Sequence, residues 1–151
     1  MADIAAFPTI RKVFDSGAEN FITMTATNAV KAGMVVEIDA TGVDLAVNAA
    51  VKESGASPVG VALYDAAAGA KVAVATIGAV VYVANAESNV DIDAGDLLVT
   101  NDNTVGGTVS ASVAVGTTST PQKLIGIAID DIDRSTTGRC LITLGHVTAH
   151  A

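Results

Sequence analysis

The chain has 151 residues, a formal net charge of −8 at pH 7 and 50% hydrophobic residues, of which very few are aromatic. This length suits one domain with a substantial core. The acidic balance argues against direct contact with nucleic acid, which rewards clustered Lys and Arg. No apolar run approaches the about 18 residues of a membrane helix, so we expect no membrane span.

Residues 1–17 differ from the rest of the chain. They carry Phe7, Pro8, Ile10, Val13 and Phe14 without any helical or alternating period. No basic stretch leads into a long apolar run, so we expect no signal peptide. One interpretation is a frayed terminus. The other is an arm that packs on another subunit or partner, because disordered tails are rarely so apolar. The binding residues would then be Phe7, Pro8, Ile10, Arg11, Lys12 and Phe14, with the two cations pairing with carboxylates.

From residue 20 onward the pattern predicts strands and turns. Residues 21–27 are rich in β-formers and partly alternating. Ala32-Gly33 and Ala94-Gly95 each precede an apolar run, which predicts a tight turn entering a strand. Similar strands are predicted to begin at Gly60 and Gly126, and another, half-exposed, at residues 108–115. Turns and loops are predicted at 39–42, 54–58, 101–103, 106–107 and 116–121.

The strand-like segments occur twice in the same order. The first copy comprises 30–36, 59–65 and 72–78, and the second 92–98, 125–131 and 140–145. Two copies are too few for a solenoid. We therefore expect an arm (1–17) followed by a single β-domain (18–151) made of two related halves, about 30–78 and 92–145.

The fold class predicted from these segments is all-β: a compact barrel or sandwich of about ten short strands, with an internal two-fold repeat and an extended N-terminal arm. Alanine-rich segments 49–53 and 65–70 offer a helical alternative. They are too short to form independent helices and would make single turns at most.

Residues that carry chemistry are scarce. His146 and His150 have helical i, i+4 spacing but no intervening Glu, so an exposed tail is a better interpretation than a zinc site. Cys140, the only cysteine, excludes an internal disulfide and lies in an apolar strand pattern typical of a core residue. The aspartates of 91–96 and 130–133, and those at 39 and 44, do not match a calcium loop and suit turns.

No phosphate-binding or nucleophile motif is present either. Lys71 lacks the glycine spacing and the following Ser or Thr of a Walker loop, and no G-x-S-x-G elbow occurs. We therefore expect no metal, no cofactor and no enzymatic activity.

The repeated series of Ala-Gly turns and Gly-containing apolar strands resembles the capsid cement or decoration proteins of tailed-phage heads. The matching segments are 30–36, 59–78, 92–99 and 124–145, whereas the polar segment 101–122 and the N-terminal arm depart from the pattern. The resemblance implies a structural virion protein, made in the host cytoplasm, that binds the outer surface of an assembled capsid and stabilises it. It also implies the major capsid protein as partner and self-association, often as a homotrimer.

Two other classes remain open. A swivelling carrier domain is also a duplicated β-barrel, but neither Lys52 nor Lys71 has the expected hairpin context. A carbohydrate-binding or adhesive module normally stacks sugars on aromatic rings. Here tryptophan is absent, and Tyr64 and Tyr82 both lie in strand-like segments.

Overall fold

The computed structural model describes residues 7–17, 21–39, 45–49, 57–85, 91–100, 107, 109–111 and 122–147. These residues form eleven strands and no helix, which confirms the all-β prediction. Accordingly, no helix among the described residues is long and apolar enough to span a membrane. The strands are β1 (Phe14–Gly17), β2 (Phe21–Ala26), β3 (Val35–Ile38), β4 (Ala46–Ala49), β5 (Pro58–Ala62), β6 (Lys71–Ala75), β7 (Ala79–Ala84), β8 (Leu97–Thr100), β9 (Val109–Ala111), β10 (Gln122–Ala128) and β11 (Thr137–Val147).

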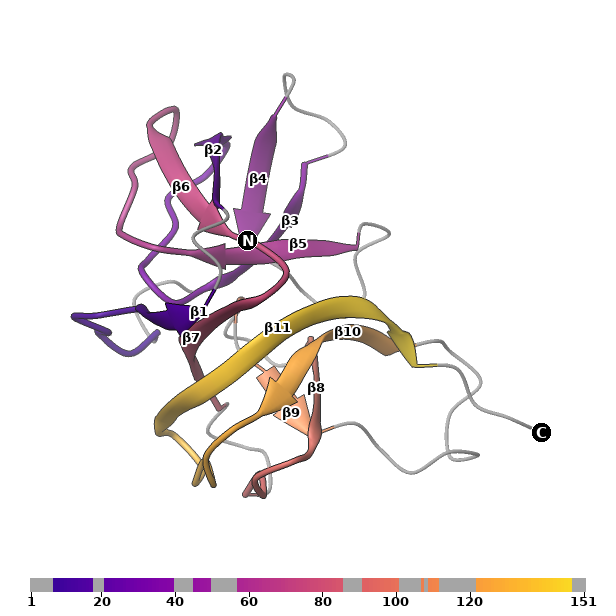
Figure 1. The fold of residues 1–151 in the computed structure, drawn as a ribbon. Helices are drawn as coiled ribbons and strands as arrows, with labels where there is room; N and C mark the ends of the chain where they lie inside the picture. Colours follow the sequence, from indigo (N-terminus) through magenta and orange to yellow (C-terminus); the bar gives the residue numbers. More distant parts are fainter. Residues whose placement is uncertain are drawn as a thin grey trace.

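The strands form two packed units (Figure 1). Strands β2 to β6 close a five-stranded barrel in the order β2-β4-β3-β5-β6. The other six form a sheet in the order β1-β7-β11-β10-β8-β9. A parallel bridge between Asn85 and Val109 joins the end of β7 to β9. The sheet therefore also curls toward closure, and β1 lies on its edge, near the junction with the barrel.

The two units have the same strand pairing, so the two copies of the sequence motif fold alike. Strand β3 meets β5 in the register in which β8 meets β10, and the bulge falls at the same place. The matching pairs are Val35–Val61 with Leu97–Ile127, Val36–Gly60 with Leu98–Gly126, and Glu37–Pro58 with Val99–Leu124. Each strand from β2 to β6 thus has a counterpart from β7 to β11.

The Ala-Gly turns also repeat, and their prediction is confirmed. Gly33 and Gly95 have φ angles of 87° and 95°, in the left-handed region that favours glycine. The carboxylate of Asp65 accepts the amide of Ala32 at 2.9 Å, and the carboxylate of Asp131 accepts the amide of Ala94 at the same distance. These two aspartates therefore hold the turns closed.

The prediction that Gly60 and Gly126 begin strands is wrong, because both lie inside their strands, β5 and β10. A Cβ atom on Gly60 would collide with the carbonyl oxygen of Ala75, and one on Gly126 with that of Leu141. Each glycine thus marks the place where two backbones come too close for a side chain.

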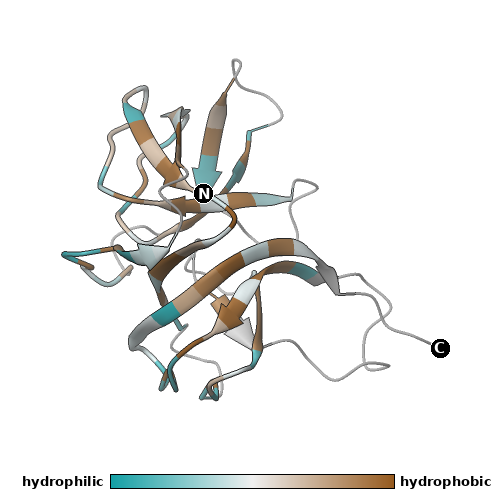
Figure 2. Cartoon of the chain, viewed as in Figure 1, coloured by the Kyte–Doolittle hydropathy of each residue, from teal (hydrophilic) through white to brown (hydrophobic). Residues whose placement is uncertain are grey.

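Two clusters of buried aliphatic side chains form the core. One fills the barrel around Met34, Val36 and Val47, and the other lies against the sheet around Leu98 and Ile125. Cys140 is fully buried in the second cluster, as the sequence predicts. Figure 2 shows apolar residues along the strands of both units and hydrophilic residues at the loop ends.

Other sequence predictions have mixed outcomes. Residues 65–70 contain a bridge and a turn, so the helical alternative is wrong there. Strand β9 confirms part of the strand predicted at 108–115. The loops at 101–103 and 116–121 lie outside the described residues, as do most of 39–42, 49–53 and 54–58. The division into an arm and one β-domain stays a prediction.

Residues 7–17 pack against both units of their own chain. Phe7 is only 2% exposed and lies in the barrel cluster, whereas Val13 lies in the sheet cluster. Ile10 contacts both clusters and occupies the space that a side chain at Gly33 would need. Strand β1 then pairs with β7. This segment is therefore part of the fold and not a frayed end.

Replacing Phe7 with alanine is expected to lower the free energy of unfolding by about 3 kcal/mol, because it leaves a cavity in the barrel core. Urea denaturation followed by circular dichroism measures this change. Thr9→Ala, at an exposed position in the same segment, is the control and should unfold like the wild type. Equal stability of Phe7→Ala and the wild type would contradict the observed packing.

Candidate functional site

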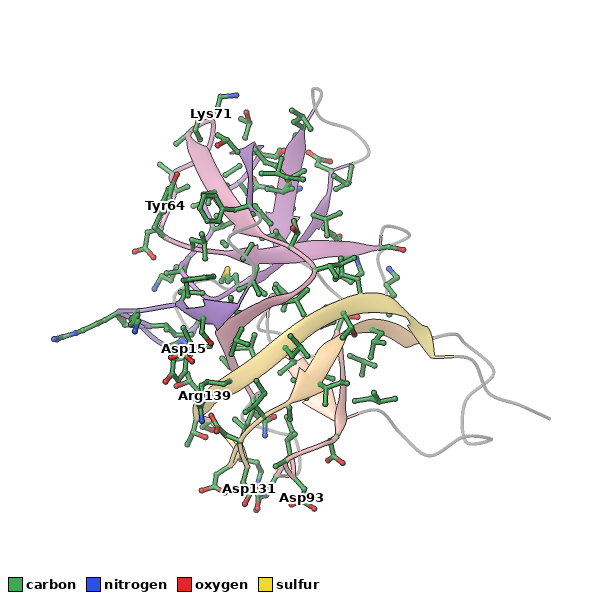
Figure 3. The ribbon with its side chains drawn as sticks, in the orientation of Figure 1. Asp15, Tyr64, Lys71, Asp93, Asp131 and Arg139 are labelled. Carbon is green, nitrogen blue, oxygen red and sulfur yellow. The ribbon has the colours of Figure 1, made fainter. Side chains whose placement is uncertain are left out.

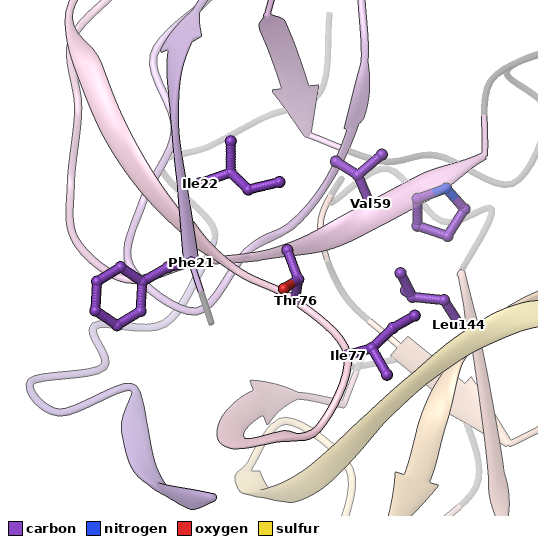
Figure 4. Close-up of a pocket in the computed structure, with 7 residues that line it drawn as sticks. Phe21, Ile22, Val59, Thr76, Ile77 and Leu144 are labelled. Carbon is purple, nitrogen blue, oxygen red and sulfur yellow. The ribbon is translucent and has the colours of Figure 1, made fainter. Parts of the chain in front are cut away.

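An apolar groove of about 630 Å³ opens where the barrel meets the sheet (Figure 4). Strands β2 and β5 contribute to it, together with the turn between β6 and β7 and the later part of β11. None of its lining residues carries a charge, although the chain is strongly acidic. The lining residues are Phe21, Ile22, Pro58, Val59, Thr76, Ile77 and Leu144.

Three large apolar side chains of the groove are well exposed to solvent. Phe21 is 52% exposed, Ile22 47% and Ile77 58%. Single exposed apolar residues are ordinary on protein surfaces, but a gathering of them around a concave surface is typical of an interaction site. The groove is therefore the strongest candidate binding surface in the described part of the chain.

Each copy of the repeat contributes to this groove a bulky apolar residue that directly precedes a glycine. Ile77 precedes Gly78 at the end of the first copy, and Leu144 precedes Gly145 at the end of the second. Leu144 lies beside the bulge in the β10–β11 pairing and has a φ of 56°. A left-handed backbone is energetically unfavourable at leucine, so the surrounding structure must hold Leu144 in this conformation.

The structure places the predicted arm residues in two groups. Phe7, Ile10 and Phe14 pack against the clusters of their own chain. The side chains of Arg11 and Lys12 are exposed, and Pro8, the remaining predicted residue, is half-buried. The role of these six residues in binding a partner stays a prediction, but only the two cations fully face solvent.

Aspartates that follow β7 and β10 accept hydrogen bonds from backbone amides, both within one loop and between the two loops (Figure 3, which labels Asp93 and Asp131). The carboxylate of Asp91 accepts the amide of Arg134 at 3.0 Å, and that of Asp96 accepts the amide of Asp93 at 3.1 Å. Among the described residues there is no group of His, Cys, Asp and Glu that suits a metal ion. The hydrogen bonds to backbone amides match the interpretation of these residues as turn carboxylates. The His146–His150 pair extends beyond the described residues.

One ion-pair network ties the N-terminal segment to the sheet. The guanidinium of Arg139 on β11 donates to both carboxylate oxygens of Asp130, at 2.9 and 2.7 Å, and lies 3.7 Å from the carboxylate of Asp15 on β1. The side-chain hydrogen bonds from Arg139 are the main reason that the pKa of Asp130 lies below its ordinary value of 3.8. The pKa of Arg139 is raised by the same contact.

Because the pKa of Asp130 is lower in the folded chain, the ion pair stabilises the fold above the ordinary carboxylate pKa, and this stabilisation is lost as the pH falls through the lowered value. Asp130→Asn should therefore be slightly less stable than the wild type at neutral pH, and the difference should vanish once the pH falls below the lowered pKa of Asp130. Thermal unfolding over a pH series measures it. A difference that stays constant down to the lowest pH would contradict this assignment.

The sequence pattern points to some of the residues that line the groove but not to others. The pattern of residues 21–27 predicts a strand, but nothing in their alternation shows that β4 pairs with β2 only at residues 25–26 and that Ile22 is exposed. Ile77 carries the clearest signal, since it is a bulky apolar residue immediately before Gly78 in a tight turn. Such turns normally carry small polar residues.

The described residues define a class of protein: a duplicated all-β fold, with a closed barrel and a related sheet, that carries an uncharged apolar groove. Residues 16–144 match the phage cement protein family, and the chain belongs to it. It is accordingly a capsid-binding structural protein of the phage virion. Functionally characterised proteins gave no significant match.

Solved structures share the fold, and one of them comes from a phage head. The N base of the head fiber gp8.5 of bacteriophage phi29 is similar to this chain with a TM-score of 0.57 and 23% sequence identity. The similarity covers 82% of this chain and 93% of that chain. The β-rich architecture is therefore one that another phage head protein also uses.

Proposed function

We propose that this cement protein binds the outer surface of an assembled capsid, contacts the major capsid protein and stabilises the shell against the pressure of the packaged genome. The groove is the observation that supports this proposal, because it offers an uncharged apolar surface on an acidic protein. The centres of protein interfaces are typically depleted in charge and enriched in aromatic and aliphatic anchors.

The proposed function is binding to the capsid and involves no catalysis. The chain's only thiol, that of Cys140, is fully buried, and this burial raises its pKa to about 12. A thiol in this state is a poor nucleophile. The paired aspartates of the loops are engaged with backbone amides and with Arg139. These groups stabilise the fold, which supports a protein that acts by binding and reinforcing the capsid.

Self-association, most simply as a homotrimer, is the second part of the proposal. Ile38, Leu45 and Tyr64 are large apolar residues that are exposed and do not line the groove. They provide apolar surface for contact between copies while the groove faces the shell. Light scattering at micromolar concentration, and images of decorated capsids, measure the number of copies in each unit.

The test of the proposed function uses purified protein and expanded capsids that lack it. The protein should bind in a saturable manner and should raise the temperature at which the capsids release their genome. Bound copies are counted by densitometry, and genome release is followed with a DNA-binding dye. Failure of the full-length protein to bind, or binding without any gain in heat resistance, would contradict the proposal.

Arg11 and Lys12 are proposed to pair with carboxylates of the partner. The double variant Arg11→Glu/Lys12→Glu should bind capsids less tightly, with the largest loss at low salt, because exposed ion pairs are screened by salt. Binding isotherms at several salt concentrations measure this effect. The double variant Lys31→Glu/Lys71→Glu has the same charge change on the barrel and is the control. Equal binding by both double variants would contradict a specific role for Arg11 and Lys12.

A further inference from the structure

Strands β2 and β7 are equivalent, but within the described part of the chain only β7 has a second strand beside it at these positions. Phe21 and Ile22 pair with β6 as Val80 and Val81 pair with β11. On its other side β7 pairs with β1, which places Phe14 opposite Val81. Among the described residues no strand pairs with β2 at Phe21 and Ile22; its other neighbour, β4, joins only further along, at residues 25–26.

The missing neighbour coincides with a large difference in exposure. Val81 is fully buried, whereas its counterpart Ile22 is 47% exposed. Ile22 also lines the groove, together with Val59 and Ile77. In the second copy of the repeat, β1 lies beside β7 at Val81, and Val81 is buried. In the first copy, the described residues place no strand on that side of Ile22, and its side chain is exposed.

We infer that the free edge of β2 at Phe21 and Ile22 accepts an extended segment of the major capsid protein, which adds as a strand and fills the groove with a bulky apolar side chain. This inference rests on the proposed function. Adding an extended segment to an exposed sheet edge is a general mode of recognition: main-chain hydrogen bonds give affinity and side-chain pockets give specificity.

The β1–β7 pair indicates the chemistry of the segment. Residues directly opposite each other in an antiparallel pair have side chains on the same face of the sheet. Phe14, opposite Val81, packs into the sheet cluster. By the same geometry, the residue opposite Ile22 would direct its side chain into the uncharged groove. The segment is therefore expected to carry an aromatic or large aliphatic residue there and no charged one.

A second copy of this chain is a poorer occupant. Its own extended segment, β1, is engaged with its own β7, and the preceding residues Phe7 and Val13 are buried in its two clusters. Donating this segment would strip apolar side chains from the donor's core.

The main experiment compares two isoleucine-to-lysine variants on capsids that lack the protein. Ile22→Lys is expected to weaken binding by about tenfold or more, because it places a charge at the centre of the interface. Ile129→Lys is the matched control, since Ile129 is 40% exposed and does not line the groove. Circular dichroism verifies that both variants fold. Wild-type affinity of a folded Ile22→Lys variant would overturn the inference while leaving the proposed function intact.

Two further measurements identify the occupant without relying on a disruptive change. A photo-reactive phenylalanine analogue at Phe21 should crosslink to the major capsid protein on decorated capsids, and the amides of β2 should exchange more slowly there than in the free protein. Crosslinks to a second copy, or unchanged exchange in β2, would overturn the inference. If the wild type does not bind capsids at all, the proposed function itself fails, and this result is distinct from the other outcomes.

Discussion

The close crossing of backbones at Gly60 and Gly126 is the constraint on which both units depend. A five-stranded barrel is narrow, so its strands must bend sharply and approach one another where they turn. Any side chain at these two positions would occupy the place of a carbonyl oxygen on the next strand. Because the interior is so small, it is filled by valine, alanine and a few larger aliphatic residues. This explains why a chain that is half hydrophobic has so few aromatic residues.

The junction between the two units depends on the N-terminal segment. Ile10 contacts both apolar clusters, β1 extends the sheet, and Asp15 lies near the guanidinium of Arg139. The segment thus contributes apolar packing, main-chain pairing and charge within a short stretch of chain. It also covers in one unit the edge beside which, in the other unit, the described residues place no strand. This addition is one source of the asymmetry between the two units.

The repeat, the all-β class and the Ala-Gly turns could be predicted from the sequence because each depends on local pattern. A glycine after a small residue and before an apolar run predicts a left-handed turn whatever the tertiary fold. The environment of the arm could not be predicted in this way. Phe7 is as apolar as an interface anchor would be, and only the three-dimensional structure shows that its partners are Met24, Met34 and other residues of its own barrel.

The groove could not be predicted from the sequence for a similar reason. Ile22 alternates in step with Met24 and Ala26, so its pattern is that of a buried residue. Its exposure follows from the absence, in the described residues, of a strand beside it, and that absence becomes meaningful only when β2 is compared with β7. The sequence repeat alone does not identify the candidate binding surface. The surface is identified when the strand pairing of the two copies is compared.

The burial of Cys140 has a practical consequence for work on decorated phage heads. With its thiol enclosed and its pKa raised to about 12, it stays protonated at neutral pH and does not react readily with alkylating reagents. A cysteine introduced at an exposed position therefore becomes the single labelling site of the chain. Heads can then carry one dye or one ligand per copy, at a position chosen by the experimenter and without removing the native residue.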